Sequence, residues 1–282
     1  MSERPRLAQH SIPGRRPYQE DSIHGGELAD GRLLVAVADG MGGHAAGEVA
    51  SALALETLKA SLEADIELEE AFRLANQQVH AKSKEPGKQG MGTTLVAVVV
   101  DGDRYQVANV GDSRGYLLSA DGIKRITQDH SFVAEAMKRG QSEEEATASQ
   151  WRDALTRAIG TDAQVEVDVF GPFPVEKNTA FLLCSDGLYK TLKDPDLRGI
   201  FARSGGPKGA ANNLVTEAYE RGSDDNISVV IAEFGQVPRE QTQGTMPLEF
   251  EPPELEAEAP PSGDEPPEPE QAKGSWWQRW RK

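Results

Sequence analysis

One stretch of this chain joins a buried strand, an acid and a sharp turn. Residues 33–38 are all apolar, and they lead directly into Asp39, Gly40 and two further glycines. A short apolar run bounded by glycine predicts a core strand, so Asp39 should lie at the end of a rigid element. A carboxylate beside exposed backbone carbonyls suits a hard divalent cation. Capping of the next helix is the commoner role of such an aspartate, and this stretch alone favours it.

Composition limits the alternatives. The 282 residues suffice for one large domain or two small ones, and the net charge of -16 argues against a nucleic-acid partner. Nine acids and no base lie between Glu249 and Glu270, so much of that charge belongs to one segment. The single cysteine, Cys184, excludes an intramolecular disulfide. The polar N-terminus predicts no signal peptide and no membrane span, and therefore a cytoplasmic protein.

Hydrophobic periodicity predicts helices and strands along most of the chain. Asp-Gly pairs at 101–102 and 121–122 predict hairpins, and Pro172 with Pro174 predicts a turn. The polar segment 142–150 is typical of a surface excursion. The expected strands are 7–12, 33–38, 93–100, 105–110, 115–119, 123–126, 165–170, 179–184 and 227–231, and the expected helices are 49–62, 68–79, 129–140, 152–159, 196–201 and 209–219.

Three regions follow from this pattern. Residues 1–235 are expected to form the globular domain. Residues 236–274 are rich in proline and glutamate, which predicts a disordered linker. Residues 275–282 carry Trp276, Trp277 and Trp280 among basic residues, a composition typical of a docking peptide for a protein partner or, as the second choice, an anionic membrane surface.

Five aspartates share a position at the end of an expected strand, mostly beside glycine. Together they provide the oxygen-rich donor set that magnesium or manganese prefers. Cys-x-x-Cys, His-Glu-x-x-His and Gly-x-x-x-x-Gly-Lys motifs are absent from the sequence, which argues against a structural zinc, a zinc protease and a P-loop nucleotidase. The five are Asp21, Asp39, Asp112, Asp186 and Asp225.

Six motifs containing these acids closely resemble the bacterial form of the metal-dependent protein phosphatase family, the PPM or type 2C serine/threonine phosphatases. They occur in the family's order over most of the chain, which makes the match specific. The motifs are Arg16-Pro17-Tyr18-Gln19-Glu20-Asp21, Asp39-Gly40-Met41-Gly42-Gly43-His44, Gly92-Thr93-Thr94, Gly111-Asp112-Ser113-Arg114, Ser185-Asp186-Gly187-Leu188 and Asp225-Asn226.

The resemblance implies an α+β fold, a four-layer α-β-β-α sandwich of two stacked antiparallel sheets flanked by helices. It implies two manganese or magnesium ions, bridged by Asp39. One ion would also take the Gly40 carbonyl and, through water, Glu20 and Asp21. The other would take Asp186 and Asp225.

Further roles follow from the same resemblance. Asp112, with Asp186, would serve a weaker third ion, and Arg16 would hold the substrate phosphate. Segment 131–152 would form a flap beside the site. Gln19 replaces the family's usual asparagine. Met41 stands where eukaryotic members place a proposed general-acid histidine, and His44 is expected to be structural, so the leaving-group acid is unassigned.

The implied activity is hydrolysis of phosphoserine and phosphothreonine in proteins, in which a hydroxide bridging two metals attacks phosphorus directly. It would reverse a bacterial serine/threonine kinase of the eukaryotic type, and the enzyme would be a monomer. Two alternatives are a pseudophosphatase that binds phosphoproteins without hydrolysis and a scaffold directed by the C-terminal segment. Retention of all five acids argues against the pseudophosphatase.

Overall fold

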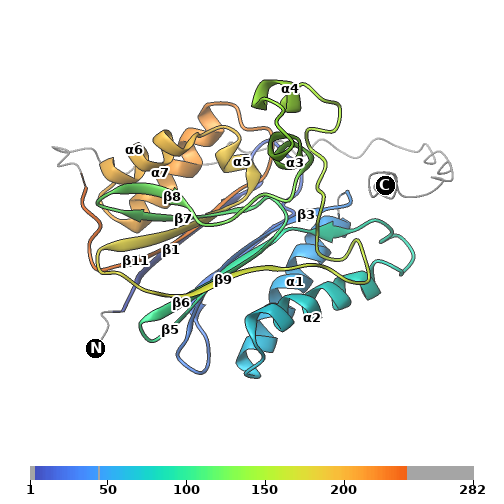
Figure 1. The fold of residues 1–282 in the computed structure, drawn as a ribbon, viewed down its shortest axis with the longest axis horizontal. Helices are drawn as coiled ribbons and strands as arrows, with labels where there is room; N and C mark the ends of the chain where they lie inside the picture. The colour runs from blue at the N-terminus through green and yellow to red at the C-terminus, as the bar shows by residue number, and fades with distance from the viewer. Residues whose placement is uncertain (1–3, 44, 240–282) are drawn as a thin grey trace. The chain divides into compact units, whose positions relative to one another are not determined.

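Two antiparallel sheets form the centre of the computed structural model, which describes residues 4–43 and 45–239 (Figure 1). The first sheet has the order β1-β11-β10-β7-β8, and the second has the order β2-β3-β5-β6-β9, with β4 paired to β3. The strands are β1 (Arg6–Ile12), β2 (Asp21–Glu27), β3 (Leu33–Met41), β4 (Gly92–Thr93), β5 (Leu95–Asp101), β6 (Arg104–Val110), β7 (Arg114–Ser119), β8 (Gly122–Arg125), β9 (Asp168–Pro174), β10 (Thr179–Cys184) and β11 (Ile227–Phe234).

Alternation along the strands divides the apolar side chains between two cores. In β3, Val35 and Val37 belong to the cluster between the sheets, together with Phe181 and Val230 of the other sheet. The intervening residues of β3 belong to a second cluster with the helices, because successive side chains of a strand face opposite sides. The sequence of β3 is therefore continuously apolar, because the strand is buried on both faces.

Helices cover both outer faces of the sheet pair (Figure 1). Helices α1 and α2 pack on the second sheet through residues such as Leu58 and Phe72. Helix α7 packs on β1 and β11 of the first sheet, and α6 packs on α7. The helices are α1 (Ala45–Glu63), α2 (Leu68–Lys82), α3 (Phe132–Lys138), α4 (Glu143–Thr147), α5 (Asp186–Tyr189), α6 (Asp194–Arg203) and α7 (Pro207–Glu220). The expected four-layer α-β-β-α sandwich is confirmed.

Two local predictions were wrong. Segment 152–159 is not helical, because Ile159 exchanges backbone hydrogen bonds with Thr93, with N···O distances of 2.8 and 3.0 Å, and its end is thereby held as a β-bridge. Pro172 and Pro174 lie within β9 rather than in a turn, which an edge strand tolerates. The segment 142–150 is largely exposed, as predicted, and it contains α4, whose N-terminus has a capping box between Ser142 and Glu145.

The packed domain also extends beyond the expected end at residue 235. Val237 is buried, and its N–H donates to the Glu233 carboxylate over 3.0 Å. Arg239 donates to both oxygens of the fully buried Glu233, each over 2.9 Å, and its guanidinium lies over the Phe201 ring. Residues 236–239 thus belong to the domain rather than to a linker, while the predicted linker from residue 240 and the docking peptide 275–282 lie outside the described residues.

Candidate metal centre

The five aspartates lie at strand ends on both sheets. Asp21 begins β2 and Asp39 lies near the end of β3, so the second sheet provides both. Asp186 follows β10, and Asp225 precedes β11, in the first sheet. Asp112 lies in the turn from β6 to β7, where the chain passes from one sheet to the other. The site therefore spans the junction between the sheets.

Register fixes the relation between two of these acids. Asp21 and Asp39 are directly opposed partners in the β2–β3 pair. The Oδ2 atom of Asp21 accepts hydrogen bonds from the hydroxyls of Ser185 and Ser228, over 2.8 and 2.6 Å, both from the first sheet. The Asp39 backbone is held by Thr94, whose hydroxyl accepts from the Asp39 N–H over 2.9 Å. Neither strand end can therefore shift without breaking these bonds.

Burial and mutual repulsion raise the pKa of these carboxyl groups. Burial raises the pKa of Asp39 well above its ordinary value, and the charges of Asp21, Asp186, Asp112 and Asp225 raise it further. Burial likewise raises the pKa of Asp21 to about 7, in spite of the two serine hydrogen bonds. The site thus holds more negative charge than its surroundings can compensate.

Unsatisfied oxygen atoms test whether a cation fits. Asp21 and Asp186 are each less than one-tenth exposed, and the Oδ1 atom of each is buried with no hydrogen-bond partner among residues 4–43 and 45–239. Burying such an atom is costly unless something binds it. In this same part of the chain, no three His, Cys, Asp or Glu side chains are gathered into a finished cation-binding group. The donor chemistry nevertheless fits hard divalent cations, because every donor is an oxygen.

Gly40 permits the close packing around this centre. A Cβ atom at Gly40 would lie 2.2 Å from the Gly47 carbonyl oxygen and 2.5 Å from the Glu20 carbonyl oxygen. The Gly40 N–H donates to that Glu20 oxygen over 3.1 Å. The start of α1 and the Glu20 backbone are therefore brought against the Asp39 turn, so Glu20 lies beside Gly40. His44 lies outside the described residues.

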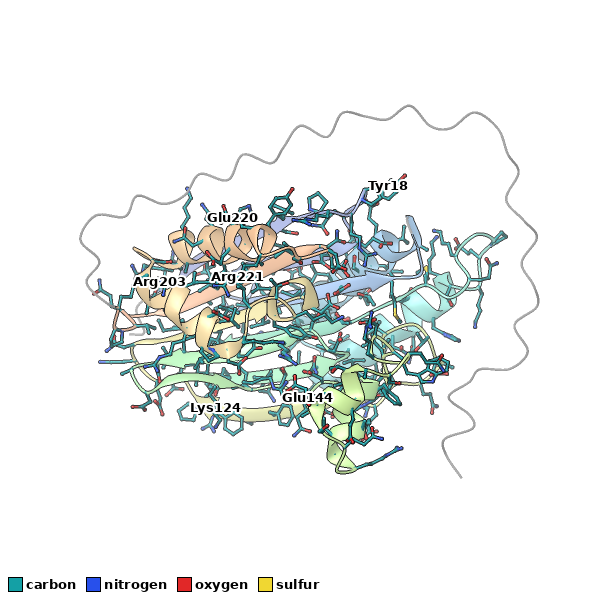
Figure 2. The ribbon with its side chains drawn as sticks, turned by 90° about the horizontal axis from the view of Figure 1, so that it is seen from above. Tyr18, Lys124, Glu144, Arg203, Glu220 and Arg221 are labelled. Atoms are coloured by element: carbon teal, nitrogen blue, oxygen red, sulfur yellow. The ribbon has the colours of Figure 1, made fainter. Side chains whose placement is uncertain are left out.

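Arg16 lies on a loop fastened to the turn before β11. Its Nη2 atom is 2.8 Å from Asp225 Oδ2, and its Nε atom donates to the Asp224 carbonyl over 2.9 Å. Asn226 holds the loop through its amide, which donates to the carbonyls of Pro13 and Tyr18 over 3.0 and 2.8 Å. Tyr18 itself projects from the surface (Figure 2). The guanidinium is half-exposed, so it can reach a ligand while it remains beside Asp225.

A second network supports Asp112. The Tyr189 hydroxyl lowers the pKa of Asp112, and the Arg114 guanidinium lies over the Tyr189 ring, 3.6 Å from its centroid. Arg114 in turn donates to both oxygens of Asp129, over 3.1 and 2.7 Å. Burial and the charge of Asp186 together raise the pKa of Asp112 to about 7. Arg114 is thus fixed by Asp129 and Tyr189.

The predicted flap segment 131–152 is attached next to Asp112. Buried His130 accepts from the Gly111 N–H at Nδ1 over 3.1 Å, and its Nε2 lies 3.1 Å from Asp168. Beyond it, Phe132 N–H donates to the Ala154 carbonyl over 2.8 Å, which closes the base of the segment. Helices α3 and α4 form the segment itself, at one end of the sheets (Figure 1).

Sequence reasoning missed one cation in the site. The Lys190 ammonium lies 2.7 Å from Asp186 Oδ2 and 3.3 Å from Asp153 Oδ1. Spacing of four residues from Asp186, in a segment that begins a helix, is the signal that could have identified it. Asn226 belongs to the Asp225-Asn226 motif, but the sequence does not show that its side chain holds the Arg16 loop by hydrogen bonds.

The protein phosphatase 2C family model matches residues 6–227. A serine/threonine phosphatase stp from Listeria monocytogenes is 37% identical over 231 residues, which cover 77% of this chain and 91% of that protein. The crystal structure of a bacterial serine phosphatase superposes with a TM-score of 0.76 at 30% identity, and it covers 82% of this chain and 98% of the other. The catalytic domain of the phosphatase PstP, in complex with two manganese ions, superposes with a TM-score of 0.69 at 33% identity, over 83% of this chain and 99% of that one.

Proposed function

Since the chain belongs to the protein phosphatase 2C family, we propose that it removes phosphate from phosphoserine and phosphothreonine in proteins. Family membership makes it a metal-dependent protein serine/threonine phosphatase. The observation that carries the mechanism is the group of mutually repelling aspartates, with two buried carboxylate oxygens that lack hydrogen bonds, beside a half-exposed arginine.

Two divalent cations, manganese or magnesium, would be held by residues of both sheets. On the second sheet, Asp39, the Gly40 carbonyl and, through water, Glu20 and Asp21 provide oxygens. On the first sheet, Asp186 and Asp225 provide them. When bound, such cations neutralise a phosphomonoester and lower the pKa of a water molecule that can attack phosphorus. The PstP neighbour with two manganese ions supports this number of ions.

Arg16 would bind the phosphate oxygens. Its guanidinium is already held at the edge of the acidic group by Asp225 and the Asp224 carbonyl, so little side-chain freedom is lost when substrate arrives. A guanidinium fork matches two phosphate oxygens. Binding of the phosphate by Arg16 would place phosphorus near Asp39 and Asp225, where the activated water is expected.

Partners and location complete the proposal. The substrates would be proteins phosphorylated by a cognate kinase, and the enzyme would act as a cytoplasmic monomer. None of the helices in residues 4–43 and 45–239 is both long and apolar enough to cross a bilayer. The C-terminal peptide 275–282 would bind a protein partner, and fusion of residues 273–282 to a fluorescent carrier, followed by retention assays on lysate and anionic vesicles, tests that role.

Phosphate release from a phosphothreonine peptide tests the proposed function. We expect turnover with manganese or magnesium and none with excess chelator. Asp39→Asn should abolish turnover, whereas the matched control Glu176→Gln, at the far end of β10 from Asp186, should keep it. Full activity in chelator would refute the metal mechanism. A wild-type protein that binds manganese and phosphopeptide without hydrolysis would be the pseudophosphatase.

A further inference from the structure

Lys190 brings a fixed positive charge into the acidic group. Its side chain projects from the residue after α5, four positions beyond Asp186, and its ammonium lies 2.7 Å from Asp186 Oδ2. On the other side the ammonium lies 3.3 Å from Asp153 Oδ1, near the base of the flap segment. Asp186 and Asp153 thus hold the ammonium from two directions.

The two oxygens of the Asp186 carboxylate have different surroundings. Oδ2 carries the Lys190 ammonium, while Oδ1 is buried and has no hydrogen-bond partner in the described part of the chain. Asp186 can therefore offer Oδ1 to a divalent cation shared with Asp225 and keep Oδ2 on Lys190. A second divalent cation on Oδ2 would have to displace the ammonium.

The segment that carries Lys190 also packs beside the turn that carries Asp112. The ring of Tyr189, the preceding residue, lies over the Arg114 guanidinium, 3.6 Å from the ring centroid. Arg114 begins β7, two residues after Asp112. The Lys190 ammonium is thus bound to Asp186, the acid that was expected to share a weaker third ion with Asp112.

We propose that the Lys190 ammonium takes the place of a third divalent cation at Asp186 and Asp112, so that the chain binds two divalent ions and not three. The inference rests on the proposed function, because it presumes the pair of ions at Asp39, Asp186 and Asp225. A divalent cation and the ammonium would repel each other if both bound the Asp186 carboxylate, whose side chain is only 13% exposed. A tethered ammonium also has no translational freedom to lose when it occupies the place, whereas a free ion does.

Counting bound manganese tests this inference. Full-length protein is dialysed to equilibrium against manganese over a range of concentrations, and bound metal is measured by mass spectrometry and by titration calorimetry. We expect two ions per chain for the wild type, as in the PstP neighbour. Lys190→Met, which keeps an unbranched side chain one atom shorter and removes the charge, should gain a third, weaker binding event. Combining it with Asp112→Ala should remove that event again.

Two controls isolate the charge of Lys190. Lys190→Arg keeps a cation and should still bind two ions, and Lys208→Met, on the exposed side of α7, should behave as the wild type. Thermal melts establish that each variant is folded. A third ion in the wild type that Asp112→Ala removes, or two ions in a folded Lys190→Met protein, would overturn the inference while the proposed function stands. A wild type that binds no manganese would refute both.

Discussion

Asp21→Asn should stabilise the metal-free protein in a pH-dependent way. In the folded state the pKa of Asp21 is about 7, against 3.8 for the ordinary group, because the carboxyl is buried among other acids. Between these values the folded state holds a proton that the unfolded state has lost, so the free energy of unfolding falls as the pH rises through this window and is constant above it. One pKa unit corresponds to about 1.4 kcal/mol, which gives a penalty of about 4 kcal/mol at pH 8 and about 2 kcal/mol at pH 5.

Asparagine carries no charge and can still accept from Ser185 and Ser228, so it avoids this penalty. Urea unfolding in chelator, followed by circular dichroism, should therefore show an advantage of the variant that grows by about 2–3 kcal/mol between pH 5 and pH 8. The exposed Asp121→Asn serves as control. With saturating manganese the order should reverse, because the wild type binds the ion more tightly. Equal stability of wild type and variant across this range would mean that Asp21 ionises at no cost and that the acids do not form one strained group.

Other predictions concern the two arginines and the flap. Arg16→Ala should lower kcat/KM by about 10- to 150-fold, because a hydrogen bond to a charged group contributes about 1.5–3 kcal/mol. Manganese affinity, measured by calorimetry, should be nearly unchanged. Loss of metal binding would instead show that Arg16 has a structural role. Arg239→Ala should lower the free energy of unfolding, measured in urea, by about 3 kcal/mol. Among residues 4–43 and 45–239, the buried Glu233 carboxylate would then keep only Arg6 and the Val237 N–H as partners, and unchanged stability would contradict that account. His130→Ala should weaken attachment of the flap and raise hydrogen exchange at Gly111, whereas unchanged protection would assign that turn to other contacts.

Much of the site could be predicted from the sequence, because an apolar run that ends in Asp and Gly encodes both a strand and its end. Asp39 and Asp186 illustrate this: each follows an uninterrupted buried strand segment. Strand β2 could not be predicted in the same way. Its sequence contains Gly25 and Gly26 and little alternation, and its place is decided by partners far along the chain. A Cβ at Gly25 would lie 2.8 Å from Val230 of the other sheet.

The features that could not be predicted from the sequence depend on contacts between distant segments. The helical spacing of 152–159 was real, but pairing of Ile159 with Thr93 outweighed local propensity. Asp186 is buried beside a close backbone contact, because Gly187 fits directly against the Asn226 carbonyl oxygen, 2.1 Å from where a Cβ of residue 187 would be. A contact of this kind between two backbone segments cannot be predicted from local sequence. Lys190 was overlooked since a lysine after a helical turn is ordinarily solvated.

The position of the acids on two different sheets links catalysis to the packing between those sheets. Asp21 and Asp39 move with one sheet and Asp186 and Asp225 with the other, so the valine and phenylalanine layer around Val98 and Phe181 sets the distance between the two halves of the centre. A substitution such as Val98→Ala, in the layer between the sheets, would let one sheet settle toward the other and change the separation of the acids on the two sheets. The hydrophobic interior thereby acts as a spacer, and inherited variation in it can adjust turnover without altering any residue that touches the substrate.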